Sequence, residues 1–163
     1  MCASGRTRTA DLLITNCRII RTRDLRSVDE EFGRAIESIE SKPRDAVSAA
    51  CNILEAVCKT YIEDEKLTMP AKQDLQGVWS VVRKHLGFDP SALQDQDLQK
   101  IISGLISIVN GIGALRTHAS SAHGAGRTIY RLEPRHARLA VHAAHTATAF
   151  IIESWDRKKT REV

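Results

Sequence analysis

The residues best suited to chemistry lie in one stretch, 115–127, where an apolar helical pattern is followed by arginine, histidine and glycine. Arg116 lies eighteen residues after Leu98. This is five whole turns at 3.6 residues per turn, so an unbroken helix places Arg116 along the apolar stripe. If the helix persists, His123 follows on the same face. An always-charged guanidinium beside an imidazole that titrates near neutrality predicts a phosphate site with a proton-transfer group.

Arg116 requires a partner, because a charged side chain buried without a counter-charge or water costs several kcal/mol. Glu55 is a candidate partner, since it borders the apolar stripe of a helix predicted over about 44–64. Two interpretations of Glu55 remain open. Either it forms an exposed i,i+4 ion pair with Lys59, worth about 0.3 kcal/mol, or it turns inward and meets Arg116.

Five of the six histidines fall between residues 118 and 145, which raises the question of a metal site. No cysteine or acidic residue stands at ligand spacing beside His142 and His145, so we expect neither a metal nor a cofactor. A histidine cluster that faces phosphate suits the sequence better, with His123 as its main member and His118 as a weaker one. The sequence contains no Walker, Rossmann or Gly-x-Ser-x-Gly element.

Several amphipathic segments must position these side chains, and their apolar residues recur at helical spacing. We predict a short helix after Ser27 or Asp29 and four longer helices, over about 44–64, from Pro70 to Gly87, over about 94–119, and from Pro134 until it fades at 156–159. Because no alternating strand pattern occurs, the predicted fold is all-α: an antiparallel four-helix bundle with a short extra N-terminal helix. Gly104, Gly111 and Gly113 are predicted to allow close approach of a neighbouring helix.

Charge is unevenly distributed along the chain, whose formal net charge is +4. Residues 1–26 carry six arginines and two aspartates without a sustained apolar period, so we predict a poorly packed basic arm. The helical domain is predicted to span 27–157, and a polar tail to occupy 158–163. A second basic cluster, five arginines between 116 and 138 opposed only by Glu133, should attract polyanions.

The composition bears on compartment and redox state. The hydrophobic content of 42% fits a globular domain, and no run approaches the ~20 apolar residues of a membrane span. The first 26 residues lack the apolar core of a signal peptide, so we expect a cytoplasmic protein. Four cysteines show no CxxC spacing. Cys51 and Cys58, which share one helical face, are predicted to be reduced core residues.

Several segments together resemble a known family. Arg116, six intervening residues and His123 fit the R-x(4 to 6)-H signature of the HEPN superfamily (higher eukaryotes and prokaryotes nucleotide-binding). A closer resemblance, to the C-terminal domain of abortive infection proteins within that superfamily, is carried by the segments 42–46, 54–59, 122–127, 139–142 and 150–155. The resemblance extends over residues 42–157.

This resemblance implies a HEPN-type endoribonuclease that acts in abortive infection, a defence against phage. Such a reaction needs no metal, because the 2′-hydroxyl of RNA attacks the adjacent phosphate and leaves a 2′,3′-cyclic phosphate and a 5′-hydroxyl. The implied catalytic residues are Arg116 as phosphate clamp, His123 as general acid or base, and Glu55, which orients the arginine. The implied RNA- or phosphate-binding residues are Arg127, His118, Arg131 and Lys59.

The resemblance also implies a homodimer, because HEPN proteins pair their sites and a single histidine must otherwise serve two proton transfers. RNA or a nucleotide is the expected ligand, an antitoxin or another defence protein is an expected partner, and no membrane is expected. One residue departs from the family pattern: Thr117 follows Arg116, where many HEPN nucleases carry Asn or Asp. This departure favours an alternative, a non-catalytic defence module that binds nucleotide or RNA or mediates dimerisation.

Overall fold

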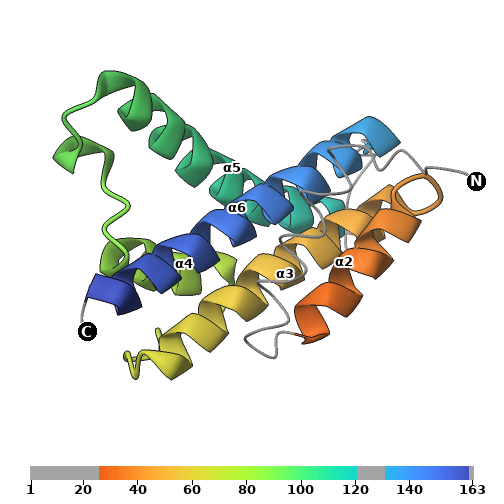
Figure 1. The fold of residues 1–163 in the computed structure, drawn as a ribbon. Coiled ribbons are helices and arrows are strands. Elements are labelled where there is room, and N and C mark those ends of the chain that lie inside the picture. Colours follow the sequence, from red (N-terminus) through yellow and green to blue (C-terminus); the bar gives the residue numbers. More distant parts are fainter. Residues whose placement is uncertain (1–25, 121–130, 162–163) are drawn as a thin grey trace, which may run out of the picture.

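The computed structural model describes residues 26–120 and 131–161, which form five α-helices and one 3-10 turn, with no strand in either range (Figure 1). The elements are α2 (Arg26–Ser38), α3 (Pro43–Asp64), α4 (Leu75–His85), η1 (Pro90–Ala92), α5 (Gln96–Ser120) and α6 (Pro134–Arg161). The predicted all-α bundle with a short extra helix before it is therefore confirmed. All but the last residue of the predicted arm, 1–26, lies outside the described residues.

The central helix of the bundle is α3, which contacts each of the other four α-helices. Pro43 begins it, where the missing backbone N–H costs no hydrogen bond. Its predicted apolar stripe is buried throughout, because neighbouring helices cover it on several sides. The stripe consists of Val47, Ala50, Cys51, Leu54, Val57, Cys58 and Tyr61. Both cysteines are free thiols in this core, as predicted.

The start of α4 differs from the prediction. The helix begins at Leu75 rather than at Pro70. Asp74 caps it, because its Oδ1 accepts a hydrogen bond from the backbone N–H of Gly77 at 2.9 Å and satisfies one of the unpaired N–H groups of the first turn. At the other end Gly87 has a φ of +73°, the left-handed conformation predicted for a glycine that follows a helix.

Gly77 lies where the chain before α4 folds over its first turn. A Cβ atom at this position would stand 1.9 Å from the carbonyl oxygen of Lys72 and 3.3 Å from Oδ1 of Asp74. Only glycine therefore allows the segment 72–74 to approach the helix this closely. Part of that segment forms one wall of the site described below.

Neighbouring helices cover α5 along only part of its length. Its second half packs into the bundle, where Val109 and Ile112 are buried. Its first half diverges from α6 and α3 (Figure 1), and Leu98, Ile101 and Ile108 are 50%, 64% and 45% exposed. The predicted stripe is therefore only partly buried in the first half, where Ile102 and Leu105 still pack against the core but Leu98, Ile101 and Ile108 do not.

By length and composition α5 could cross a membrane over Gln96–His118, although polar residues interrupt this stretch and it is no continuous apolar run. Its apolar residues are spread over two sides of the helix, of which one packs into the bundle and the other is exposed. Only 11% of its most apolar part is buried. Apolar residues thus occupy more of the helix surface than the single stripe that was predicted.

The glycines of α5 also behave differently from the prediction. A Cβ atom at Gly104 or Gly111 would meet no atom within 4 Å, so these two positions face open space. At Gly113 the nearest atom would be Cδ2 of Leu75 at 3.6 Å, an ordinary contact. The predicted close approach of a neighbouring helix therefore does not occur at Gly104 or Gly111 within the described chain.

The last helix, α6, crosses α5, packs along α3 and is anchored at its end by Trp155 (Figure 1). The buried Trp155 donates from Nε1 to Oε1 of Glu65 in the turn after α3, at 2.6 Å. The helix continues to Arg161. The described part of the predicted polar tail, 158–161, is therefore helical and carries exposed basic residues into the solvent.

Candidate functional site

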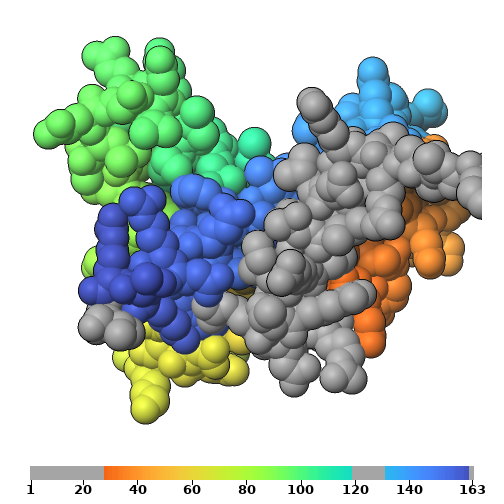
Figure 2. Space-filling view, viewed as in Figure 1, coloured from red at the N-terminus to blue at the C-terminus, as the bar shows by residue number. Residues whose placement is uncertain are grey.

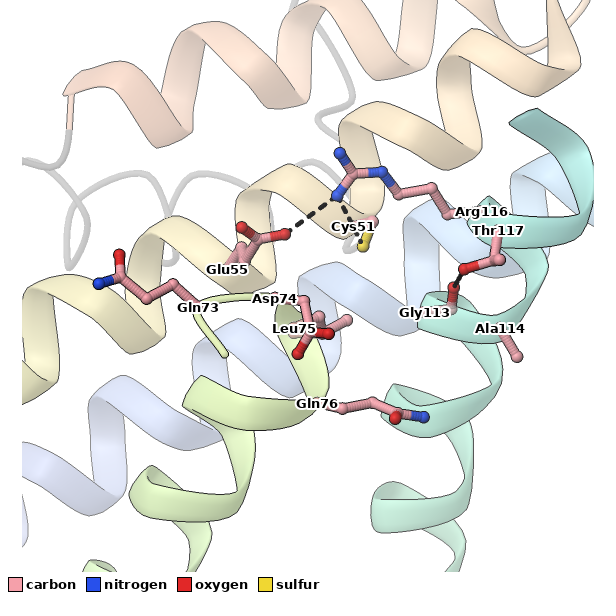
Figure 3. Close-up of a pocket in the computed structure, with 10 residues that line it drawn as sticks. All are labelled: Cys51, Glu55, Gln73, Asp74, Leu75, Gln76, Gly113, Ala114, Arg116 and Thr117. Carbon is pink, nitrogen blue, oxygen red and sulfur yellow. Dashed lines mark hydrogen bonds and ion pairs between the residues drawn. The ribbon is translucent and has the colours of Figure 1, made fainter. Parts of the chain in front are cut away.

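The second half of α5, the middle of α3 and the start of α4 surround a cavity of about 510 Å³ (Figure 3). It is lined by Cys51 and Glu55 of α3, by Gln73, Asp74, Leu75 and Gln76 at the start of α4, and by Gly113, Ala114, Arg116 and Thr117 of α5. Most of the α4 wall is solvent-exposed, so the cavity opens to solvent on that side.

Arg116 reaches across this cavity from α5 to α3 (Figure 3). Its Nη1 donates to Oε2 of Glu55 at 3.0 Å and to Sγ of Cys51 at 3.5 Å. The two acceptors are four residues apart on α3, so they lie on the same face of that helix. Glu55 thus turns inward to Arg116, which is the second of the two orientations that the sequence left open.

The guanidinium retains unused hydrogen-bond donors. The Arg116 side chain is 40% exposed, whereas that of Glu55 is 17% exposed. Water as well as Glu55 therefore compensates the charge of Arg116, which is less buried than the apolar stripe suggested. Nη2 and Nε form no hydrogen bond with a described residue, and Nη2 points away from Glu55 in Figure 3. Their N–H groups are available to a ligand.

Glu55 supplies the charge that holds Arg116. Burial raises the pKa of the Cys51 thiol, and the nearby guanidinium offsets only part of this effect, so the thiol stays protonated at neutral pH. The pKa of Arg116 is raised by its hydrogen bond to Cys51 and further by the charge of Glu55. A neutral thiol and a carboxylate therefore hold a guanidinium that is charged at every physiological pH.

A second cation also contacts Glu55. The Nζ atom of Lys59 lies 3.0 Å from Oε1, the carboxylate oxygen that Arg116 does not use. Glu55 therefore contacts Lys59 as well as Arg116, although its side chain is turned inward rather than exposed. One carboxylate is shared between two cations, so Lys59, Glu55 and Arg116 together carry a positive charge that attracts anions to this side of α3.

Sequence reasoning missed the wall that α4 contributes. Gln73, Asp74 and Gln76 line the cavity although no pattern in the sequence singled them out for this role. Asp74 is recognisable as a capping residue three positions before Gly77, but a cap carries no information about which helix lies opposite. Cys51 was predicted only as a core residue, and its contact with Arg116 depends on how α5 crosses α3.

Thr117 lines the cavity beside Arg116. Its hydroxyl donates to the backbone carbonyl of Gly113 at 3.1 Å, one turn earlier in the same helix. Threonine commonly forms this bond within helices, and it directs the hydroxyl hydrogen towards the backbone. Thr117, the residue that departs from the family pattern, therefore donates its hydroxyl hydrogen to the backbone of its own helix.

The remaining predicted site residues are distributed more widely. His118, in the last turn of α5, and Arg131, before α6, are exposed and do not line the cavity. His123 and Arg127 lie outside the described residues, so their roles stay predictions. Among the residues that the structure describes, no group of three or more His, Cys, Asp and Glu could hold a metal ion.

Comparison with known proteins gives one family match. The family described as Abi_C, HEPN-like domain, matches residues 26–155. The match covers α2 to α5 and most of α6, and it includes both Glu55 and Arg116. No curated protein and no solved structure matches the chain.

Proposed function

Because the chain belongs to the family of HEPN-like Abi_C domains, we propose that it is a metal-independent endoribonuclease of abortive infection, a defence against phage. The family points to a defence role of the abortive-infection type. RNA cleavage by attack of the 2′-hydroxyl is our proposal for the reaction. We place this activity in the cytoplasm, under the control of an antitoxin or another defence protein.

The observation that carries the proposal is the anchored position of Arg116 at the cavity. Glu55 holds Nη1 at 3.0 Å, while Nη2 and Nε keep N–H donors without a partner among the described residues. Parallel N–H donors of this kind match two oxygens of a phosphate. An arginine already held by a carboxylate loses less conformational entropy when the phosphate binds.

RNA supplies its own nucleophile, so the protein needs only to hold the phosphate, move protons and stabilise developing charge. The 2′-oxygen bonds to phosphorus as the bond from phosphorus to the 5′-oxygen breaks. A base takes the 2′-hydroxyl proton and an acid protonates the leaving 5′-oxygen. We assign His123 to one of these transfers, Arg116 to the phosphate and Arg127 to the phosphoryl oxygens. Flanking phosphates are assigned to His118, Arg131 and Lys59.

We further propose that the protein acts as a homodimer, which associates through an exposed face of α5. The support comes from Ile101, Gly104, Ile108 and Gly111, which we call the α5 seam. Spacings of three and four residues place them on one face of α5. Both isoleucines are exposed and both glycines face open space. Large and small residues alternate, so two antiparallel copies of this face can interlock around a two-fold axis.

Incubation of the purified protein with total RNA in EDTA tests the reaction. We expect cleavage that leaves 2′,3′-cyclic phosphate ends. His123→Ala should lower the rate about 10²-fold or more and largely keep RNA affinity, as for loss of a general acid or base. Arg116→Ala should lower both the cleavage rate and the RNA affinity, because the guanidinium contacts the phosphate in the bound substrate and in the transition state. The matched control is Arg34→Ala, an exposed arginine on α2 that does not line the cavity.

The alternative is a non-catalytic module that binds RNA or a nucleotide, or that mediates dimerisation. Thr117 favours it, because this residue replaces the Asn or Asp of many HEPN nucleases and its hydroxyl donates to Gly113. A parent protein that binds RNA in an Arg116-dependent manner and cuts none of it would establish this alternative. A Thr117→Asn variant that then cleaves RNA would identify Thr117 as the cause.

A further inference from the structure

A second basic region lies at the ends of α4 and α6. Two adjoining hollows of about 450 and 370 Å³ share the turn formed by Gly87, Phe88 and Asp89, and we call them together the basic groove. Five cations line it: Arg83 and Lys84 from the last turn of α4, and Arg157, Lys158 and Arg161 from the end of α6. In Figure 2 the end of α6, in dark blue, lies below the first half of α5, in green.

Positive charge in the basic groove exceeds negative charge. Asp89 is the one acidic residue in its lining, and its Oδ1 already accepts hydrogen bonds from the backbone N–H and the hydroxyl of Ser91, at 2.9 and 2.7 Å. Lys158 lies 2.9 Å from Nε2 of His85. The other four cations form no ion pair with a described residue. Basic residues at the end of a single helix can be explained by their stabilising interaction with the helix dipole. Here the ends of two helices bring their basic residues to the same groove.

A polar track on α4 connects the Arg116 cavity with the basic groove. Gln76 lines the cavity, whereas Ser80 and Arg83 line the groove. Their spacing of four and then three residues places all three on one face of α4. Seven residues of helix separate the ends of this track, which is about 10 Å at ~1.5 Å per residue. The track carries only polar side chains.

We infer that the basic groove is a second RNA-binding site, which holds the backbone of a strand whose scissile phosphate lies at Arg116. The inference rests on the proposed function for its substrate class. Successive phosphates of a helical strand advance about 3.4 Å along the helix axis, so about three nucleotides would span the track. The groove also contains the apolar side chains of Leu86, Phe88, Leu93, Ile102 and Phe150. The track that joins it to the cavity carries only polar side chains, which suits a phosphate backbone better than the apolar face of a partner helix.

The wall of the basic groove adds a contact for a base. Phe150 is half-buried in the lining, and its ring centroid lies 4.9 Å from that of Phe88. Stacking on an aromatic ring does not depend on base identity, because every base has a π-face. The groove would therefore strengthen RNA binding without selecting a sequence, and it leaves the choice of cleavage position to the Arg116 cavity.

The test compares non-cleavable, fully 2′-O-methylated RNA of about two nucleotides, too short to span the track, with RNA of about twelve nucleotides, between about 50 and 200 mM salt. Each single-strand phosphate contact contributes about 0.7 to the slope of log affinity against log salt concentration. Arg83→Gln/Arg157→Gln should therefore reduce the slope for the long RNA by about 1.4 and leave that for the short RNA unchanged. Lys84→Gln/Arg161→Gln repeats the test with exposed residues whose replacement spares the fold.

The charge-matched control is Arg34→Gln/Lys42→Gln, which removes two cations on and after α2 and should change neither slope. An unchanged slope for the long RNA in both groove variants would overturn the inference. Loss of binding to an oligo-glutamate peptide together with that unchanged slope would assign the groove to an acidic protein, which overturns it too. Failure of the proposed function would be recognised by two other results. RNA would remain intact after incubation with the protein, and the Arg116→Ala variant would bind the short RNA as tightly as the parent does.

Discussion

The two halves of α5 contain the same kinds of residue at the same spacing, yet they have different surroundings. The second half is covered by α3, α4 and α6, buries Val109 and Ile112, and presents Arg116 to the cavity. The first half carries Leu98, Ile101 and Ile108 into solvent. Apolar periodicity therefore predicts which face of a helix is stabilised by burial. Whether another part of the same chain buries that face depends on the neighbouring elements.

The largest expected effect concerns packing in the covered half. Ile112→Ala should lower the free energy of unfolding by about 2–4 kcal/mol, the usual cost of a cavity in a core. Ile101→Ala should change it by less than about 0.5 kcal/mol at a protein concentration where copies are separate. Urea unfolding of both variants measures the difference. Equal costs at the two positions would show that the face of α5 that carries Ile101 is packed as well.

The exposed half should matter for association instead. Ile108→Asp should weaken self-association at least about tenfold, which corresponds to ~1.4 kcal/mol, because a charge would be buried in the α5 seam. Helical circular dichroism should be unchanged, and sedimentation over a range of concentrations measures the dimer. The exposed Ile36→Asp on α2 is the matched control. A parent protein that is monomeric at micromolar concentration would contradict the proposed dimer.

Gly104, which belongs to the α5 seam, provides a further test of the exposed half of α5. Gly104→Ala should raise the stability of the monomer by about 0.5–1 kcal/mol, because alanine is the better helix former and its Cβ meets no atom within 4 Å. The same change should weaken the dimer, where the added methyl group obstructs close approach of the second helix. Opposite signs in thermal unfolding and in sedimentation would therefore support the seam, and a gain in both would contradict it.

The smallest expected effect concerns the ion pair that fixes the covered half to α3. In a double-mutant cycle of Glu55→Ala and Arg116→Ala, we expect a coupling free energy of about 0.5 kcal/mol. This value is low for a 3.0 Å pair because Arg116 is 40% exposed and water screens it. Additive effects of the two replacements on unfolding would show that Glu55 does not position the arginine energetically.

Some of this architecture could be predicted from the sequence. The apolar stripe of α3 was predicted residue by residue, because a central helix has neighbours on most of its surface and every apolar position finds cover. The start of α4 could not be predicted, since Pro70 and Asp74 are both acceptable helix starts. The choice between them depends on how the segment 72–74 folds over Gly77, which is a tertiary contact.

The candidate site shows the same division. The spacing from Leu98 placed Arg116 on a definite face, and α5 is unbroken from Gln96 to Ser120, as that argument required. The choice between Lys59 and Arg116 as the partner of Glu55 stayed open, because the distance between α3 and α5 is not encoded in either helix alone. The contact of Cys51 with the guanidinium depends on the same crossing of helices.

Gly77 shows that a residue can govern a site without touching its ligand. Any side chain there would collide with the carbonyl oxygen of Lys72 and push residues 72–74 outwards, although two of the cavity's lining residues belong to that segment. In a library of all single substitutions selected for the activity of the cavity, position 77 should be as intolerant as position 116. Natural variants at this glycine would then lose activity without altering any group that meets the substrate.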